Sequence, residues 1–62
     1  MYYVNFYDVD GFRVLTHYLE SSSSRDEQTE RVKEIASNYK ELNIKHFEII
    51  MASGQRVFRA GL

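Results

Sequence analysis

The sequence predicts an α+β fold: one domain in which an antiparallel four-stranded sheet carries one helix on one face, in the order ββαββ. Three observations predict it. Strand-forming residues flank the Asp10-Gly11 pair, apolar residues recur at helical spacing over residues 25–42, and alternating residues flank the Ser53-Gly54 pair. The chain has 62 residues, so we expect residues 1–62 to form a single domain.

The first hairpin is predicted over residues 2–19. The segments "YYVNFYDV" and "FRVLTHYL" are rich in aromatic and β-branched residues, and Asp-Gly between them favours a two-residue type I′ turn. Such a turn places Asp8 opposite Arg13, Tyr7 opposite Val14 and Phe6 opposite Leu15. The opposite charges of Asp8 and Arg13 across the ladder favour this register.

The helix is predicted over about residues 25–42. Ser24 and Glu27 match a capping box, and Glu27 with Arg31 forms a favourable pair four residues apart. Asn43 is expected to end the helix. The apolar residues at helical spacing are Val32, Ile35, Ala36, Tyr39 and Leu42.

The serine run at residues 21–24 is interpreted as a short connection whose last member caps the helix. A phosphorylation tract is the alternative, and the sequence does not distinguish the two.

The second hairpin is predicted over residues 45–60. A two-residue turn places Glu48 opposite Arg59 and Ile49 opposite Phe58. Serine suits the first position of a type I′ turn less well than Asn or Asp, so a longer loop with a bulge is an alternative.

One helix can cover only one face of such a sheet. The side chains expected beneath the helix are Val4, Phe6, Leu15, Leu19, Phe47, Ile49, Met51 and Phe58. Those expected on the opposite face are Tyr3, Tyr7, Val9, Phe12, Val14, Tyr18, Ile50 and Val57. An aromatic surface of this size on a small protein indicates an interaction site. Its partner is either a second copy of the chain, giving a homodimer, or a foreign protein.

Composition excludes several classes. The chain has no cysteine, which rules out disulfides and thiolate metal sites and suits the cytoplasm, where we expect the protein to work. No apolar run is long enough to span a bilayer, and the start lacks signal-peptide features. The net charge is −1, with −2 over residues 1–20 and +2 over residues 45–62, so no strong field attracts nucleic acid or a membrane.

No catalytic or cofactor site is predicted. The histidines, His17 and His46, have no further ligands at metal-binding spacing. No elbow motif frames a serine, and the glycines are too dispersed to cradle a phosphate. We therefore expect a protein that is not an enzyme and uses no metal or cofactor.

Two binding functions remain. Sheet tyrosines beside Lys45, Arg56 and Arg59 can stack and neutralise single-stranded nucleic acid, which is the less favoured alternative. The favoured function is protein binding. The candidate partner-binding residues are Tyr3, Tyr7, Phe12, Tyr18, Arg56 and Arg59.

The segments "YYVNFYDVDGFRVLTHYL", "ERVKEIAS" and "HFEIIMASGQRVFRAG" resemble, in element order and length, two groups of small inhibitors encoded by phages and mobile elements. These are the anti-CRISPR proteins with a hairpin, a helix and a second hairpin, and the antitoxin of T-even phages. The resemblance implies an inhibitor that occludes a surface of a host protein or nucleoprotein complex in the host cytoplasm. It carries over no functional residue and leaves the target unidentified.

Overall fold

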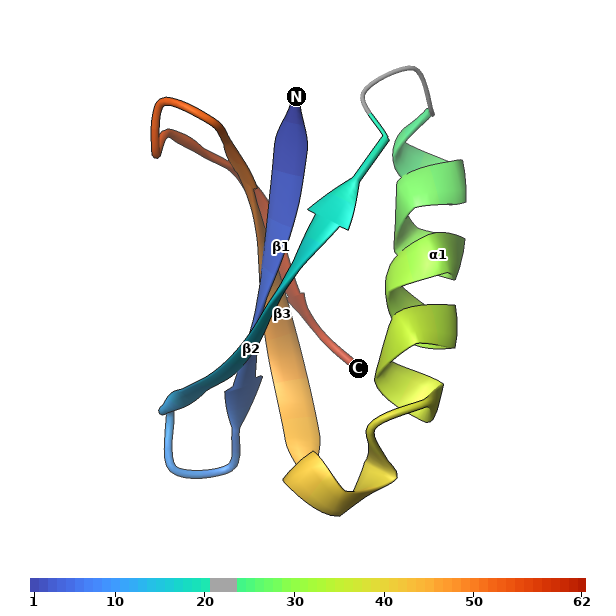
Figure 1. Ribbon diagram of the computed structural model, residues 1–62, viewed down its shortest axis with the longest axis vertical. Helices are drawn as coiled ribbons and strands as arrows, with labels where there is room; N and C mark the ends of the chain where they lie inside the picture. Colours follow the sequence, from blue (N-terminus) through green and yellow to red (C-terminus); the bar gives the residue numbers. More distant parts are fainter. Residues whose placement is uncertain (21–23) are drawn as a thin grey trace.

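A computed structural model describes residues 1–20 and 24–62. Its elements are β1 (Tyr2–Asp8), β2 (Arg13–Leu19), α1 (Arg25–Ser37), the 3-10 helix η1 (Lys40–Leu42), β3 (Ile44–Met51) and β4 (Arg56–Gly61). Figure 1 shows α1 alongside one face of the sheet. The predicted ββαββ order is confirmed. The serine run, for which a phosphorylation tract was the alternative interpretation, lies largely outside the described residues.

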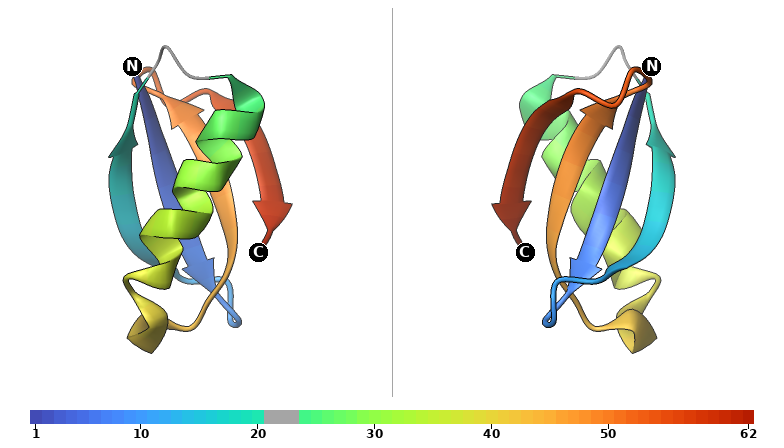
Figure 2. Two further views of the ribbon diagram at one scale, coloured as in Figure 1. Left: turned by 90° about the vertical axis from the view of Figure 1, so that its right-hand side faces the viewer. Right: turned by 90° about the vertical axis from the view of Figure 1, so that its left-hand side faces the viewer.

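The four strands form one antiparallel sheet in the order β2-β1-β3-β4. The two hairpins therefore lie side by side, with β1 and β3 paired in the centre and β2 and β4 at the edges. Figure 2 shows α1 crossing one face diagonally and, from the opposite side, a face on which all four strands are in view. No helix among residues 1–20 and 24–62 is long and apolar enough to cross a membrane.

The core lies between α1 and the two central strands. Its buried apolar residues are Val4, Phe6, Leu19, Val32, Ile35, Phe47 and Ile49. Strand alternation puts the β1 and β3 members on one side of the sheet, as predicted. Met51, expected in the core, is 37% exposed because it pairs with Tyr2 at the end of the sheet.

The start of α1 has the predicted cap. Ser24 Oγ accepts a hydrogen bond from the Glu27 backbone N–H at 3.3 Å, which satisfies a donor that has no partner within the helix. Arg25, the first residue of α1, lies over the Phe58 ring, with its guanidinium carbon 5.2 Å from the ring centroid. This contact places the first turn of α1 over β4.

The end of α1 differs from the prediction, because the helix stops at Ser37 and not near residue 42. The Tyr39 backbone leaves the helical region (φ −129°, ψ 43°), and Lys40–Leu42 form a separate 3-10 turn. Asn43 ends that turn in the left-handed conformation (φ 54°), which Asn tolerates better than most residues. Tyr39 still packs against the core.

The ion pair within α1 also differs from the prediction. Arg31 pairs with Glu34, three residues on, and not with Glu27. Glu27 Oε1 instead accepts a hydrogen bond from Ser24 Oγ at 3.2 Å. The cap therefore uses the glutamate that was expected to pair with Arg31.

The β1–β2 loop is longer than the predicted two-residue turn. Gly11 N donates to Asp8 O and Asp8 N donates to Phe12 O, both at 3.0 Å, with Gly11 at φ 84°. Asp8 Oδ1 accepts hydrogen bonds from two further backbone N–H groups, those of Asp10 and Phe12, which stabilises the longer loop. The predicted pairing of Asp8 with Arg13 is therefore wrong.

A shift of register follows this loop. Phe6 lies opposite Leu15 as predicted, but Tyr7 lies opposite Arg13 and not opposite Val14, so Val14 is the extra residue of a bulge. Val14 packs against the core and is not a member of the exposed face to which the alternation assigned it.

The β3–β4 loop is built in the same way, which confirms the longer loop considered from the sequence. Gly54 N donates to Met51 O at 2.8 Å, Met51 N donates to Gln55 O at 2.9 Å, and Gly54 has φ 93°. The predicted pairs of Glu48 with Arg59 and Ile49 with Phe58 are confirmed. Beyond them Ile50 lies opposite Arg56, and Val57 is the bulged residue.

The two hairpins thus share a repeat that strand alternation alone does not reveal. "GFRVL" at residues 11–15 and "GQRVF" at residues 54–58 each supply a left-handed loop glycine, an arginine, a bulged valine and an apolar residue facing α1. Val57, like Val14, packs against the core, which removes it from the predicted exposed face. The bulge after each loop is the physical reason why Val14 and Val57 do not lie on the exposed face that alternation predicts for them.

Removing the cap of α1 tests its contribution to stability. We expect Ser24→Ala to lower the free energy of unfolding by roughly 0.5–2 kcal/mol, and Ser24→Gly by only a few tenths, because glycine is itself acceptable at this position. Chemical denaturation measures both. Ser53→Ala, at an exposed serine of the β3–β4 loop whose hydroxyl bonds to no described residue, is the control and should be close to neutral; an equal loss there would show that the Ser24 effect is not capping.

A matched pair of phenylalanines tests the core. Phe6 is fully buried, so Phe6→Ala should cost about 3–5 kcal/mol, enough to unfold most of so small a domain. Phe12 is 69% exposed, and Phe12→Ala should change stability by less than about 0.5 kcal/mol. Thermal melts of the two variants decide this; similar melting temperatures would contradict the assignment of the core face.

Candidate partner-binding surface

The sheet face opposite α1 is the candidate site, and we call it the open face. Residues directly opposite one another on paired strands point to the same side, so the register defines its members. They are Tyr3, Asn5 and Tyr7 of β1, Arg13, Thr16 and Tyr18 of β2, His46, Glu48 and Ile50 of β3, and Arg56 and Arg59 of β4. No described segment covers these side chains (Figure 2).

Asn5 lies at the centre of the open face and is only 5% exposed. In the ladder it is opposite Thr16 on one side and Glu48 on the other. Thr16 Oγ1 donates a hydrogen bond to Asn5 Oδ1 at 2.7 Å. The neighbouring side chains of the open face therefore bury Asn5, although no described segment covers that face. Its amide oxygen accepts a hydrogen bond.

Glu48 is the second central residue, with its side chain 15% exposed. Its two oxygens have different partners. Tyr7 Oη donates to Oε1 at 3.2 Å, and Arg56 Nε donates to Oε2 at 2.6 Å. Tyr7 lies on β1 and Arg56 on β4, so the carboxylate on β3 connects side chains of three strands.

Two aromatic pairs flank this centre. The Tyr7 ring stacks on His46 with centroids 5.3 Å apart and an interplanar angle of 11°. Tyr3 meets Tyr18 edge to face at 6.1 Å and 79°. Tyr18, on the edge strand β2, remains 51% exposed. The open face thus presents aromatic surface whose orientation is fixed before any partner arrives.

Five of the six candidate partner-binding residues come together on the open face, namely Tyr3, Tyr7, Tyr18, Arg56 and Arg59. Phe12 does not join them, because it lies in the β1–β2 loop, where it is exposed beside the exposed Val9. Sequence reasoning missed the central roles of Asn5 and Glu48. The signal for them is a polar residue at the middle of each central strand, at positions that the pairing of β1 with β3 brings together.

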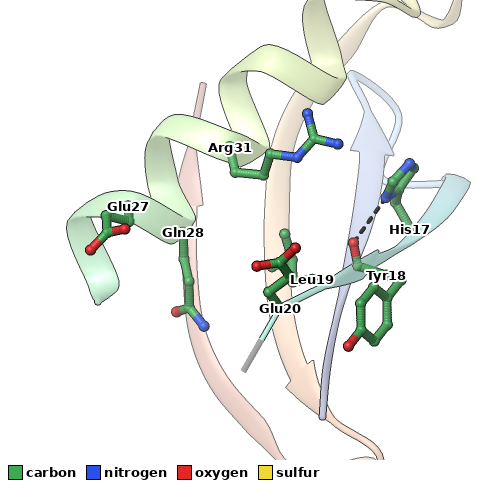
Figure 3. Close-up of a pocket in the computed structure, with 7 residues that line it drawn as sticks. All are labelled: His17, Tyr18, Leu19, Glu20, Glu27, Gln28 and Arg31. Atoms are coloured by element: carbon green, nitrogen blue, oxygen red, sulfur yellow. Dashed lines mark hydrogen bonds between the residues drawn. The ribbon is translucent and has the colours of Figure 1, made fainter. Parts of the chain in front are cut away.

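A groove of about 310 Å³ lies between β2 and α1, on the other side of the sheet. Figure 3 shows its lining, with Gln28 and Arg31 coming from α1 and His17 from β2. His17 Nδ1 lies 2.9 Å from Tyr18 O, and Arg31 is engaged by Glu34. The diagonal crossing of α1 creates this groove, because the helix departs from β2 near Leu19.

Within the described part of the chain, no three side chains among His, Asp and Glu converge as a metal site would require. Comparison of the chain with protein-family models, with curated proteins and with solved structures finds no match. The open face has hydrogen-bonded polar groups at its centre and aromatic and arginine side chains around them.

The hydrogen bond from Tyr7 to Glu48 can be tested by removing one oxygen. We expect Tyr7→Phe to lower the free energy of unfolding by about 0.5–1.5 kcal/mol, because the half-buried carboxylate loses a donor. Tyr18→Phe is the matched control, since its hydroxyl bonds to no described residue, and it should be neutral. Urea denaturation of both variants provides the measurement, and equal stability of Tyr7→Phe and the wild type would show that the bond contributes nothing.

Proposed function

We propose that this chain is a small protein-binding module that acts as a stoichiometric inhibitor, covering a functional surface of a host protein or nucleoprotein complex with its open face. The observation that carries the proposal is the open face itself. It is a sheet surface that no described segment covers, its central polar side chains are hydrogen-bonded to neighbouring side chains of the same face, and aromatic and arginine side chains surround them. Tyrosine and arginine are the side chains that most often dominate binding energy at protein interfaces.

The fixed arrangement of the open face supports a binding role. Binding costs free energy for every side chain that must be ordered. Tyr7 is already held by Glu48 and His46, and Tyr3 by Tyr18 and by its hydroxyl contact to Met1 Sδ at 3.1 Å. These aromatic side chains can therefore contact a partner with little further loss of rotamer freedom.

The proposal of an inhibitory role rests on the order of the strands and the helix. The ββαββ order, on which the resemblance to phage-encoded inhibitors depends, is that of the structure. A protein that blocks a surface by occupying it needs a rigid scaffold and a complementary face, and α1 with the core supplies the scaffold here. The proposed place of action is the cytoplasm of the host cell.

Nucleic-acid binding is less well supported. Arg56, one of the three cations considered for it, is engaged by Glu48, and that carboxylate lies at the centre of the face where a phosphate backbone would pass. A homodimer over the open face is also disfavoured, because a second copy brings the same arginines and no exposed carboxylate to meet them.

Affinity capture with variants tests the proposal. We expect tagged wild-type protein to retain a host protein from nuclease-treated lysate, and Tyr18→Ala to weaken that complex by roughly thirtyfold, the effect of losing about 2 kcal/mol at an exposed interface tyrosine. Phe12→Ala is the control, since it removes an aromatic that is even more exposed (69% against 51%) and lies outside the open face. Titration of the purified partner by calorimetry measures the affinities.

Three outcomes of that experiment count against the proposal. Loss of every partner on nuclease treatment favours nucleic acid as the ligand. Loss of the partner by Phe12→Ala with retention by Tyr18→Ala moves the site to the β1–β2 loop. A mass of twice 7.4 kDa in light scattering, abolished by Tyr18→Ala, assigns the open face to a homodimer.

A further inference from the structure

The repeat shared by the two hairpins places Arg13 and Arg56 at equivalent positions. Each follows a loop glycine by two residues and lies opposite the central strand two residues from its middle polar side chain. For Arg56 that middle residue is Glu48, and the two form an ion pair. For Arg13 the equivalent residue is Asn5, which is neutral and accepts from Thr16.

Arg59 is the third arginine of the open face. It lies opposite Glu48 in the ladder, but the two Glu48 oxygens are already bonded to Tyr7 and Arg56. Among residues 1–20 and 24–62, neither Arg13 nor Arg59 takes part in an ion pair. Each arginine is exposed and lies on an edge strand, so the two cations lie on opposite sides of the centre formed by Asn5 and Glu48.

Charge is consequently segregated between the two sides of the domain. Three arginines and one glutamate give the open face a net charge of +2, although the whole chain has −1. The remainder of the chain therefore carries −3. The net charge of the open face favours a partner of opposite sign there.

We propose that the partner of the open face is an acidic protein surface, whose carboxylates pair with Arg13 and Arg59 while its apolar or aromatic groups pack against Tyr18 and Tyr3. The proposal rests on the proposed protein-binding function and adds the chemistry of the partner. Arginine suits this role because its planar guanidinium binds a carboxylate through two parallel hydrogen bonds. A protein is favoured over a nucleic acid because the half-buried Glu48 carboxylate at the centre repels a continuous line of phosphates more than it repels separate carboxylates at the edges.

A defined acidic polypeptide tests the inference without knowledge of the natural target. The probe is a fluorescent random copolymer of glutamate and tyrosine, titrated with the purified protein at low ionic strength and followed by anisotropy. A thymidine oligonucleotide of matched charge is the competing probe. We expect the copolymer to bind more tightly than the oligonucleotide, with an affinity that falls as salt is added.

Two double variants of equal charge decide where the probe binds. Arg13→Glu with Arg59→Glu changes the open face from +2 to −2 and should weaken binding roughly tenfold or more. Lys33→Glu with Lys40→Glu makes the same change in net charge at exposed positions of α1 and η1, and should alter affinity by less than about twofold. Thermal melts confirm that both variants are folded.

Backbone amide NMR spectra locate the contact directly. Shifts caused by the copolymer should concentrate at open-face residues such as Arg13, Tyr18 and Arg59 and be small along α1. Absence of binding by the wild type, tighter binding of the oligonucleotide, or equal losses in the two double variants would overturn the inference. If the arginine variant still binds the partner captured from lysate while Tyr18→Ala does not, the protein-binding function stands and the acidic character of the partner is wrong.

Discussion

The apolar side chains of the two central strands have a single helix to pack against, and this constraint organises the rest of the molecule. Phe6 and Phe47 lie side by side across β1 and β3 and are closed off from water by Val32 and Ile35 of α1. The helix crosses the sheet diagonally, and Arg25 over Phe58 sets its upper end above β4 (Figure 2). One helix can cover only one face of the sheet. The opposite face must therefore be stable in contact with water without a covering layer.

The open face meets that requirement with polar residues where a sheet covered on both faces would have apolar ones. Asn5 and Glu48 occupy the middle of the central strands, and every contact that the structure gives them is a hydrogen bond from a neighbour on the same face. The domain can therefore fold without a partner and still present tyrosines. A face built only of aliphatic side chains would instead favour aggregation of so small a protein. The polar centre thus needs no covering layer, and the aromatic side chains lie around it.

The sequence predicts those features of the structure that depend on interactions between residues close together in the chain. The cap at Ser24, the order of elements and the buried faces of β1 and β3 follow from patterns within short segments. The predictions are wrong where a side chain forms hydrogen bonds that change the backbone conformation favoured by the local sequence pattern. Asp8 binds two loop N–H groups and lengthens a turn that Asp10 and Gly11 favour in a shorter form. Within the open face, alternation identifies Tyr3, Tyr7 and Tyr18, and Arg56 and Arg59 are recognised only as cations of the last strand. The role of Glu48 depends on β1 pairing with β3, which hairpin signals do not specify.

The shared bulges also bear on how such a domain associates. Open sheet edges are templates for strand addition, and natural proteins counter this with charges and bulges on their edge strands. Both edge strands here begin with an arginine followed by a bulged valine, Arg13 with Val14 and Arg56 with Val57. The bulge interrupts the regular ladder and increases the local twist, and the charge resists a second unpaired strand. With both edges protected in this way, the open face is the larger surface left for association. The arginines that begin the edge strands, Arg13 and Arg56, are therefore also members of the open face, at its two borders.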